Sequence, residues 1–533
     1  KNRSEQVTRL ICNVITGDLR PINLVDGRHF KNLMKFLEPA YDLPSRQTFT
    51  RNIESMYSLA KAKLKTKFSS ANYIALTMDL WSSCKLESYL GITGHYMEVC
   101  GCKPTLRSCA IATKEVGEAH TGENIARWVE SVMEDFSVSP QQIVACVTDN
   151  GSNMVSSMRI LTEKHGWVHF RCAAHTLQLC IHDCIKQENI KRALGAARHL
   201  VQYFRQSPKA MNALKLKYAQ TRTENDPLGV ELVMDCLTRW NSSYEMLLRL
   251  VKYQLILRIV LRDETVTPRN KASHLELRES NWILIQHLVE LLEPLKAATA
   301  FLEGDQYVSI SSVIPVIKGL YEKYNTTLPE EDSFIVNFKR DMSESILRRF
   351  STVLSDESSS SITVKNMYRK ATFLHPAYKT KYFNRPVAVQ VKTFCLCIYI
   401  YCYSYTGDKL GNTGTSPVPL ESSTHTAGVL SLEDILSLGK TDNSSDSGEE
   451  DVSITEGINW YLRQKCSQAD PLTWWQANQL NSQLSQLTAK YLIIPATSAP
   501  SERCFSSAGL TVSKLRSRLT GKHVEILNFL HIN

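Results

Sequence analysis

Two short apolar segments, each ending in an aspartate, constrain the fold of this chain more than any other feature. The first spans residues 73–81 and breaks at Asp79, and the second spans residues 143–149 and ends at Asp149. Apolar runs of this length with β-branched members predict buried strands. A carboxylate at the end of an apolar strand is costly without a partner. If both strands belong to one sheet, the two acids meet at one edge, where they share a proton or hold a divalent cation.

Residues 69–171 alternate as an α/β unit. We expect strands at 73–81, 89–97, 106–113, 143–149 and 167–171, with helices at 121–136 and 152–161. Three strands, a helix, a strand, a helix and a strand is the order of a ribonuclease-H-like sheet, in which the first and fourth strands are neighbours. This order predicts that Asp79 and Asp149 lie side by side.

Helical patterns fill most of the remaining chain. We expect residues 1–68 to be helical, with Ser45 as an N-cap, and with a basic face that is either solvated or follows phosphates. Residues 172–490 are too many for a loop and predict an inserted helical domain, within which the acidic, Ser-rich stretch 420–456 is expected to be disordered. Near the end, a short helix carries Glu502. The final amphipathic helix, with Val524 and Leu527, is expected to pack in a subunit interface.

Composition sets the class and the compartment. Among 533 residues, 62 Lys and Arg against 53 Asp and Glu give a net charge of +9, a weak indication of nucleic acid. The 15 cysteines include no CxxC pair, which favours reduced thiols and a cytosolic or nuclear protein. The apolar run 394–403 is too short to span a membrane, and we expect no membrane partner. The chain begins without Met, so we expect it to be a fragment.

Five short motifs occur in a recognisable order along the chain. They are Asp79-Leu-Trp81, Thr148-Asp-Asn-Gly-Ser-Asn153, Cys172-Ala-Ala-His175, Thr238-Arg-Trp-Asn-Ser242 and Thr497-Ser-Ala-Pro-Ser-Glu-Arg-Cys-Phe-Ser506. Each is weak alone, but the ordered set, spread over nearly the whole chain, resembles the hAT-superfamily (hobo/Activator-type) DNA transposases and their domesticated BED-finger relatives.

The resemblance implies a fold and a domain plan. It implies an α/β ribonuclease-H-like core interrupted by a large all-α insertion, with helical N-terminal and C-terminal dimerisation segments. The corresponding domains are a DNA-binding or dimerisation segment (1–68), the first part of the catalytic core (69–171), the insertion (172–490), and the last part of the core with the dimerisation region (491–533).

The resemblance also implies a catalytic triad of Asp79, Asp149 and Glu502 holding two Mg²⁺ or Mn²⁺ ions. Asp79 would bridge both ions, and the other two acids would each hold one, because hard cations prefer carboxylate oxygens. The alternative from the residues alone is that these acids are turn or helix-terminus carboxylates. Zinc is expected only if the family's BED finger precedes this chain.

A second set of residues is implied to contact DNA. Trp240 would stack on an unpaired base, and His175 would lie near the scissile phosphate; the full set is Trp81, His175, Arg239, Trp240, Lys514, Arg516 and Arg518. Core packing is the alternative for both tryptophans, and a solvated turn is the alternative for the last three cations. The Cys172–Cys184 segment also holds cysteines and histidines, but it lacks the paired spacing typical of zinc sites.

These features predict a transposase that cleaves DNA with a metal ion, forms a hairpin on flanking DNA and transfers the strand. Its partners would be double-stranded DNA, as terminal inverted repeats and target, and a second copy of itself in a homodimer or higher oligomer. We expect it in the nucleus. The alternatives are a domesticated DNA-binding transcriptional regulator without catalysis, and a helical scaffold that kept only the dimerisation segment.

Overall fold

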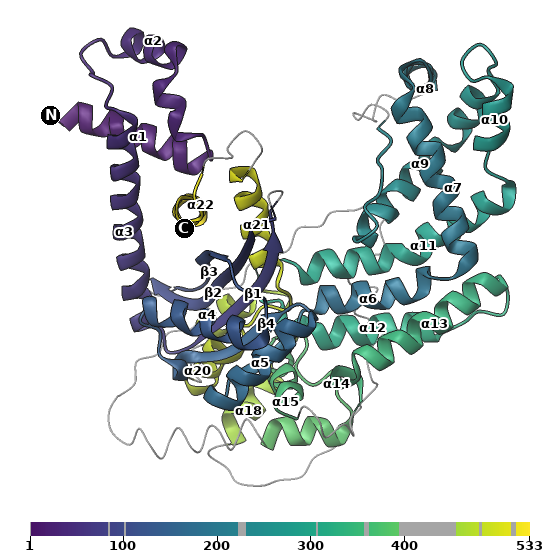
Figure 1. Cartoon of the computed structure of the whole chain (residues 1–533). Helices are drawn as coiled ribbons and strands as arrows, with labels where there is room; N and C mark the ends of the chain where they lie inside the picture. Colours follow the sequence, from purple (N-terminus) through teal and green to yellow (C-terminus); the bar gives the residue numbers. More distant parts are fainter. Residues whose placement is uncertain are drawn as a thin grey trace.

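A five-stranded mixed sheet lies at the centre of the molecule (Figure 1). The computed structural model describes residues 2–83, 86–100, 103–221, 231–304, 307–355, 362–393, 455–478, 482–512 and 519–533. The strands are β1 (Ile74–Ser82), β2 (Ser88–Cys100), β3 (Lys103–Val116), β4 (Ile143–Thr148) and β5 (Val168–Arg171). Their order is β3-β2-β1-β4-β5, with β1 antiparallel to β2 and parallel to β4. The predicted pairing of the first and fourth strands is confirmed.

The strands are apolar because both faces of the sheet are covered. Along β1, Ile74, Leu76 and Met78 pack in one core with α4 (Gly122–Asp135) and α5 (Ser152–His165). Ala75 faces the opposite way, into a larger core formed with the helical region. Successive side chains of a strand point to opposite faces of the sheet. Even-numbered residues of β1 therefore enter one core and odd-numbered residues face the other.

Three N-terminal helices stand beside the sheet: α1 (Asn2–Gly17), α2 (Arg28–Leu37) and α3 (Arg46–Ser70). The predicted N-cap is confirmed, because the Thr48 N–H donates to Ser45 Oγ at 3.3 Å. The last helix, α22 (Gly521–Ile532), packs against α1, α3 and β3. Val524 and Leu527 of α22 are each 2% exposed or less within the single chain. Leu527 packs against α1 and α3, and Val524 packs with Tyr89 of β2 and with Ala508. The stripe that was expected in a subunit interface is therefore buried by the chain itself.

The helical region forms a layered arm to one side of the sheet (Figure 1). Its helices are α6 (Ala173–Ile185), α7 (Glu188–Gln206), α8 (Pro208–Thr221), α9 (Trp240–Arg262), α10 (Arg269–Leu275), α11 (Glu279–Leu302), α12 (Val313–Asn325), α13 (Ser333–Arg349) and α14 (Ser351–Leu354). The expectation that this part of the chain is helical is confirmed.

Later helices return to the sheet. They are α15 (Ile362–Phe373), α18 (Thr455–Arg463), α19 (Pro471–Ala477), α20 (Ser482–Tyr491) and α21 (Ala499–Thr511). Contacts join α15 to β5 and α19 to β3. Helices on both sides of the predicted boundary at residue 490 therefore touch the sheet, and the insertion as a separate domain stays a prediction.

Some sequence predictions fall outside the described residues. These are the run 394–403, most of the acidic stretch 420–456, and the cations Lys514, Arg516 and Arg518. Helix α18 begins at Thr455, inside the end of that stretch. Within the described ranges, no helix combines the length and apolarity needed to cross a membrane.

Candidate active site

Asp79 and Asp149 follow directly from the last paired residues of two adjacent parallel strands. Met78 of β1 pairs with Thr148 of β4, and each aspartate is the next residue. By alternation, Asp79 shares the face of Ala75, so both acids extend the face that packs on the helical region. The Leu80 N–H donates to Asp79 Oδ1 at 2.8 Å, and the Gly151 N–H donates to Asp149 Oδ1 at 3.1 Å. Backbone donors thus orient both carboxylates.

Helix α21 brings Glu502 to the same region from a distant part of the chain. The helix contacts β1 and β2, and the Phe505 ring lies 5.6 Å from the Trp81 ring between centroids. Gly91 of β2 pairs directly with Asp79, and a Cβ at Gly91 would lie 2.2 Å from the Phe505 ring. The missing side chain at Gly91 therefore lets α21 approach the sheet beside Asp79. Glu502 lies in the first turn of this helix, where its own side chain is exposed although its neighbours in the turn are buried.

Electrostatics couples the three acids. Burial, together with the smaller effects of the Asp149 and Glu502 charges, raises the pKa of Asp79 to about 8, against the opposing effects of the Leu80 N–H and Arg239. Burial disfavours the charged form of Asp79, and the charges of the other two acids act on it more strongly than the charge of Arg239 does. Such clustering is typical of sites that are adapted to bind a cation or to transfer protons.

Glu303 is an acid that the sequence analysis missed. It follows the last residue of α11, and Arg503 Nη1 donates to its carbonyl oxygen at 3.1 Å. Burial and the charge of Glu502 raise the pKa of the Glu303 carboxyl, against smaller effects of Lys296, Arg503 and Arg239. No local pattern distinguishes Glu303 from other helix-terminal acids, since its relevance arises only when α11 meets α21.

The donor chemistry of these acids fits Mg²⁺ or Mn²⁺. Carboxylate oxygens are the preferred ligands of hard divalent cations, and a cation would neutralise the charge that raises the pKa of Asp79. The three side chains are not already gathered around a point, because no cluster of three His, Cys, Asp or Glu ligands occurs among the described residues. One oxygen of Asp79 and one of Asp149 instead accept backbone hydrogen bonds.

The Cys172–His175 motif builds the start of α6 at this edge. The Cys172 N–H donates to the Thr148 carbonyl at 2.7 Å, and Cys172 Sγ accepts from the backbone N–H groups of His175 and Ser498. Burial raises the pKa of the Cys172 thiol to about 11 and that of Cys180 to about 12. Because Cys172 Sγ accepts from two backbone N–H groups, this motif caps α6 and joins β4, α6 and the start of α21. His175 is half-buried on the first turn of α6.

The two motif tryptophans are packed. Trp81 stacks on Tyr89 at 5.1 Å and contacts Phe505. Trp240 is 2% exposed and lies in the core of the helical region, beside Ile181 and Leu247. The structure therefore favours the core alternative for both, and base stacking by Trp240 requires its ring to leave this core. Arg239, the residue before Trp240, is exposed and lies close enough to Asp79 to lower its pKa.

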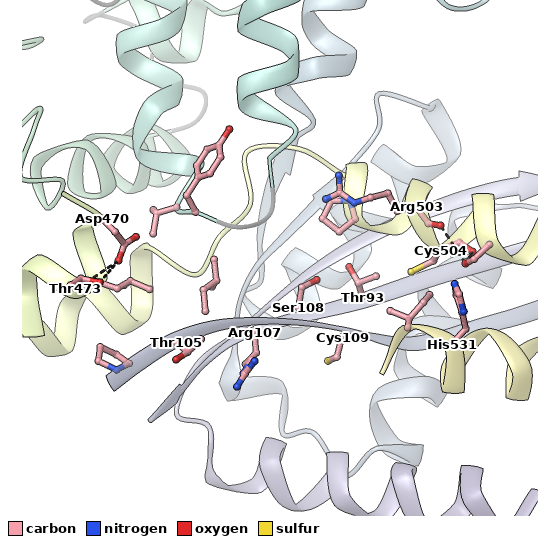
Figure 2. Close-up of a pocket in the computed structure, with 18 of the residues that line it drawn as sticks. Thr93, Thr105, Arg107, Ser108, Cys109, Asp470, Thr473, Arg503, Cys504 and His531 are labelled. Carbon is pink, nitrogen blue, oxygen red and sulfur yellow. Dashed lines mark hydrogen bonds between the residues drawn. The ribbon is translucent and has the colours of Figure 1, made fainter. Parts of the chain in front are cut away.

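A separate pocket of about 700 Å³ lies between β3, α19 and α21 (Figure 2). Its lining includes Arg107 of β3 and Arg503 of α21. Arg107 Nε donates to Glu98 Oε2 at 2.7 Å, and Arg503 donates to the Glu303 carbonyl. None of the three acids is among the described residues that line it, so this pocket is not the acid site.

Three family models match parts of the chain. The family model of the ZBED1 RNase-like domain matches residues 77–196, that of the ZBED1 RNase-like helical domain matches residues 170–291, and that of the hAT family C-terminal dimerisation region matches residues 451–533. The chain is a relative of the hAT transposases and BED-finger proteins. For this hAT relative, the RNase-like match includes Asp79 and Asp149, and the dimerisation-region match includes Glu502.

Individual relatives span both kinds of protein. The hAT relative is 27% identical to human zinc finger BED domain-containing protein 4 over 99% of its own length and 44% of that protein. It is 25% identical to the Zea mays protein named "Putative AC transposase", over 95% of this chain and 62% of that protein. It is 23% identical to the Drosophila melanogaster transposable element Hobo transposase, over 92% of this chain and 77% of that protein. The chain thus spans about half of the first two relatives.

Proposed function

We propose that this hAT relative is a DNA transposase whose Asp79, Asp149 and Glu502 carry out metal-dependent DNA cleavage and strand transfer. The observation that supports this most directly is that Met78 pairs with Thr148, so that the next residues Asp79 and Asp149 are neighbours, and that α21, which carries Glu502, packs against β1. The raised pKa of Asp79, which arises from burial and from the charges of the other two acids, agrees with this arrangement. Three acids from β1, β4 and α21 influence one another although 423 residues separate the first from the last (79 to 502). A purely structural role would favour compensation of these charges by basic side chains.

The residues of the chain have distinct tasks in this proposal. Bound Mg²⁺ or Mn²⁺ would supply a Lewis acid that activates a water or a 3′-hydroxyl and stabilises the leaving oxygen. Asp79 and Asp149 provide carboxylates on rigid strand ends, each oriented by a backbone N–H. Glu502 provides the third from α21. Arg239 adds positive charge beside Asp79, where a DNA phosphate would lie.

Partners and compartment follow from the same proposal. The substrates would be double-stranded DNA, as terminal inverted repeats and as target, and the protein would work in the nucleus. The match to a hAT C-terminal dimerisation region supports a homodimer or higher homo-oligomer.

The test is cleavage of supercoiled plasmid DNA by the purified chain with Mn²⁺. We expect nicking that Asp79→Asn and Glu502→Gln each reduce by about 10³-fold or more, because each removes a carboxylate of the reacting centre. Asp263→Asn is the matched control, since it makes the same charge change at an exposed turn. Equal nicking by all variants would contradict the proposal.

A regulator without catalysis is the second candidate. It is favoured by the BED-finger relative and by the burial of Trp240, which keeps its ring away from DNA. Tight, salt-sensitive DNA binding with no metal-dependent nicking by wild type would select it over the transposase.

A further inference from the structure

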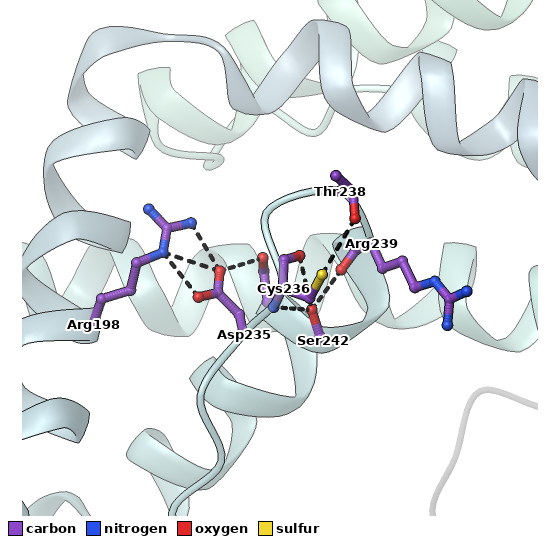
Figure 3. A network of polar contacts seen from close by, with 7 residues as sticks. Arg198, Asp235, Cys236, Thr238, Arg239 and Ser242 are labelled. Carbon is purple, nitrogen blue, oxygen red and sulfur yellow. Dashed lines mark hydrogen bonds and ion pairs between the residues drawn. The ribbon is translucent and has the colours of Figure 1, made fainter. Parts of the chain in front are cut away.

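A network of polar contacts holds the turn that precedes α9 (Figure 3). Arg198 of α7 forms three hydrogen bonds to the Asp235 carboxylate, at 2.8, 2.9 and 3.1 Å. The Asp235 side chain is 1% exposed, that of Arg198 is 28% exposed, and Ser243 Oγ also donates to Asp235 at 2.8 Å. An ion pair so shielded and so fully bonded fixes the backbone that carries it.

Ser242 closes the turn that follows this ion pair. Its hydroxyl accepts from the Cys236 N–H at 2.7 Å and donates to the Arg239 carbonyl at 2.6 Å. The Arg239 N–H donates to the Cys236 carbonyl at 3.0 Å. The turn 236–239 is therefore held at both ends by Asp235 and by the first turn of α9.

The other side of this turn is fixed to the acid site. Gln178 Nε2 of α6 donates to the Thr238 carbonyl at 2.9 Å. The N-cap of helix α6 is Cys172. Its N–H donates a hydrogen bond to the carbonyl oxygen of Thr148, the residue before Asp149. Figure 3 shows the Arg239 side chain extending away from the Arg198–Asp235 pair. The turn thus holds an exposed cation on the side of the acids, and its charge acts on both Asp79 and Glu303.

We propose that Arg198, Asp235 and Ser242 form a clamp that positions Arg239 to bind a DNA backbone phosphate beside the three acids. The clamp residues do not touch DNA and are positioning residues. Their role rests on the proposed function for the identity of the ligand, but its test does not require cleavage. An arginine held in one place binds a phosphate with less loss of conformational freedom than a mobile one.

The experiment measures binding of a fluorescent DNA duplex of arbitrary sequence to the whole chain, without divalent metal, as a function of salt. Each phosphate contact contributes about 0.9 to the slope of log K against log salt, so Arg239→Ala should lower the magnitude of the slope by about that amount. Asp235→Asn and Ser242→Ala should lower it partly, whereas Arg239→Lys should retain it. Glu188→Gln is the matched control, since it removes an exposed ion pair with Arg192 on the same α7 helix.

A double-mutant cycle separates positioning from general damage to the fold. In the Arg239→Ala background, Asp235→Asn and Ser242→Ala should change affinity by less than about two-fold, because the residue they position is gone. If Asp235→Asn and Ser242→Ala reduce DNA affinity equally in the wild-type and Arg239→Ala backgrounds, the clamp proposal is overturned. It is also overturned if Arg239→Ala alone does not lower the salt dependence of binding. Ser242→Ala keeps the test valid if Asp235→Asn does not fold. If Asp79→Asn abolishes plasmid nicking and the double-mutant cycle gives the expected DNA-binding result, both proposals are supported. If the wild-type protein does not nick plasmid DNA, only the transposase proposal is refuted.

Discussion

The acid edge of the sheet and the turn before α9 each hold a carboxylate out of water, and they treat its charge in opposite ways. The charges that act most strongly on Asp79 are those of Asp149 and Glu502, and burial together with these charges raises its pKa to about 8. Burial would also raise the pKa of Asp235, but hydrogen bonds from Arg198 and Ser243 outweigh burial and lower it. The compensated acid contributes to structure, whereas the uncompensated acids leave a charge for something outside the chain to neutralise.

The largest expected effect comes from removing Arg198, the cation that compensates the charge of Asp235. Arg198→Ala leaves the Asp235 carboxylate buried without its cation, which should destabilise the protein by about 3 kcal/mol. The measurement is the urea midpoint followed by circular dichroism. Arg192→Ala on the same helix is the control, since its ion pair is exposed and should contribute less than about 1 kcal/mol.

A second change acts on the uncompensated region through packing. Gly91→Ala places a methyl group against the Phe505 ring, which Trp81 holds in place. We expect a loss of about 1 to 3 kcal/mol and a displaced α21 that moves Glu502 away from Asp79. Plasmid nicking should fall together with the thermal midpoint. Gly195→Ala, where a Cβ meets nothing within 4 Å inside helix α7, is the control that should leave nicking unchanged and raise the thermal midpoint slightly.

The third prediction concerns the direction in which stability changes with pH, which should differ between Asp79 and Asp235. In metal-free buffer the folded state keeps a proton on Asp79 that the unfolded state releases above pH 3.8, so stability should fall as pH rises toward about 8. Asp79→Asn should remove this fall and raise the thermal midpoint at pH 8. The stabilisation by Asp235 has the opposite dependence: it is present above pH 3.8 and is lost as pH falls through its lowered folded pKa. Thermal midpoints of the Asp79→Asn and Asp235→Asn variants, measured across this pH range, test both pH dependences. If the midpoints of the two variants change with pH in parallel, the prediction is contradicted.

The smallest expected effect lies far from both regions. Ser45→Ala removes the N-cap of α3 and should cost about 1 kcal/mol at every pH between 4 and 8. Thermal midpoints at the two ends of this range check it. If the thermal midpoint of Ser45→Ala changes with pH in the same way as that of Asp79→Asn, the pH dependence of the midpoint reflects general stability and not the acid cluster.

Much of the fold was predictable because its signals are local. The apolar runs around Asp79 and Asp149, the order of strands and helices, and Ser45 before α3 all depend on a few consecutive residues. The site was predictable to the extent that strand order places two acids at one edge. Glu502 entered only through the resemblance to a family, since no local feature connects it to β1.

The remaining features depend on contacts that no local pattern records. Glu303 matters because α11 ends against Arg503, and Asp235 matters because Arg198 lies on a different helix. Trp240 follows an exposed arginine, yet its ring is buried by residues far along the chain. The apolar stripe on α22 predicted that another element would cover it, but only the structure identified α1, α3, β2 and α21 of the same chain as its cover.

The packing of Leu527 of α22 against α1 and α3 joins segments from opposite parts of this sequence. A fragment of residues 1–70 would leave the apolar faces of α1 and α3 uncovered, and a fragment of residues 71–533 would leave the same face of α22 exposed to water. When the two fragments are expressed separately and then mixed, they should therefore associate into one complex.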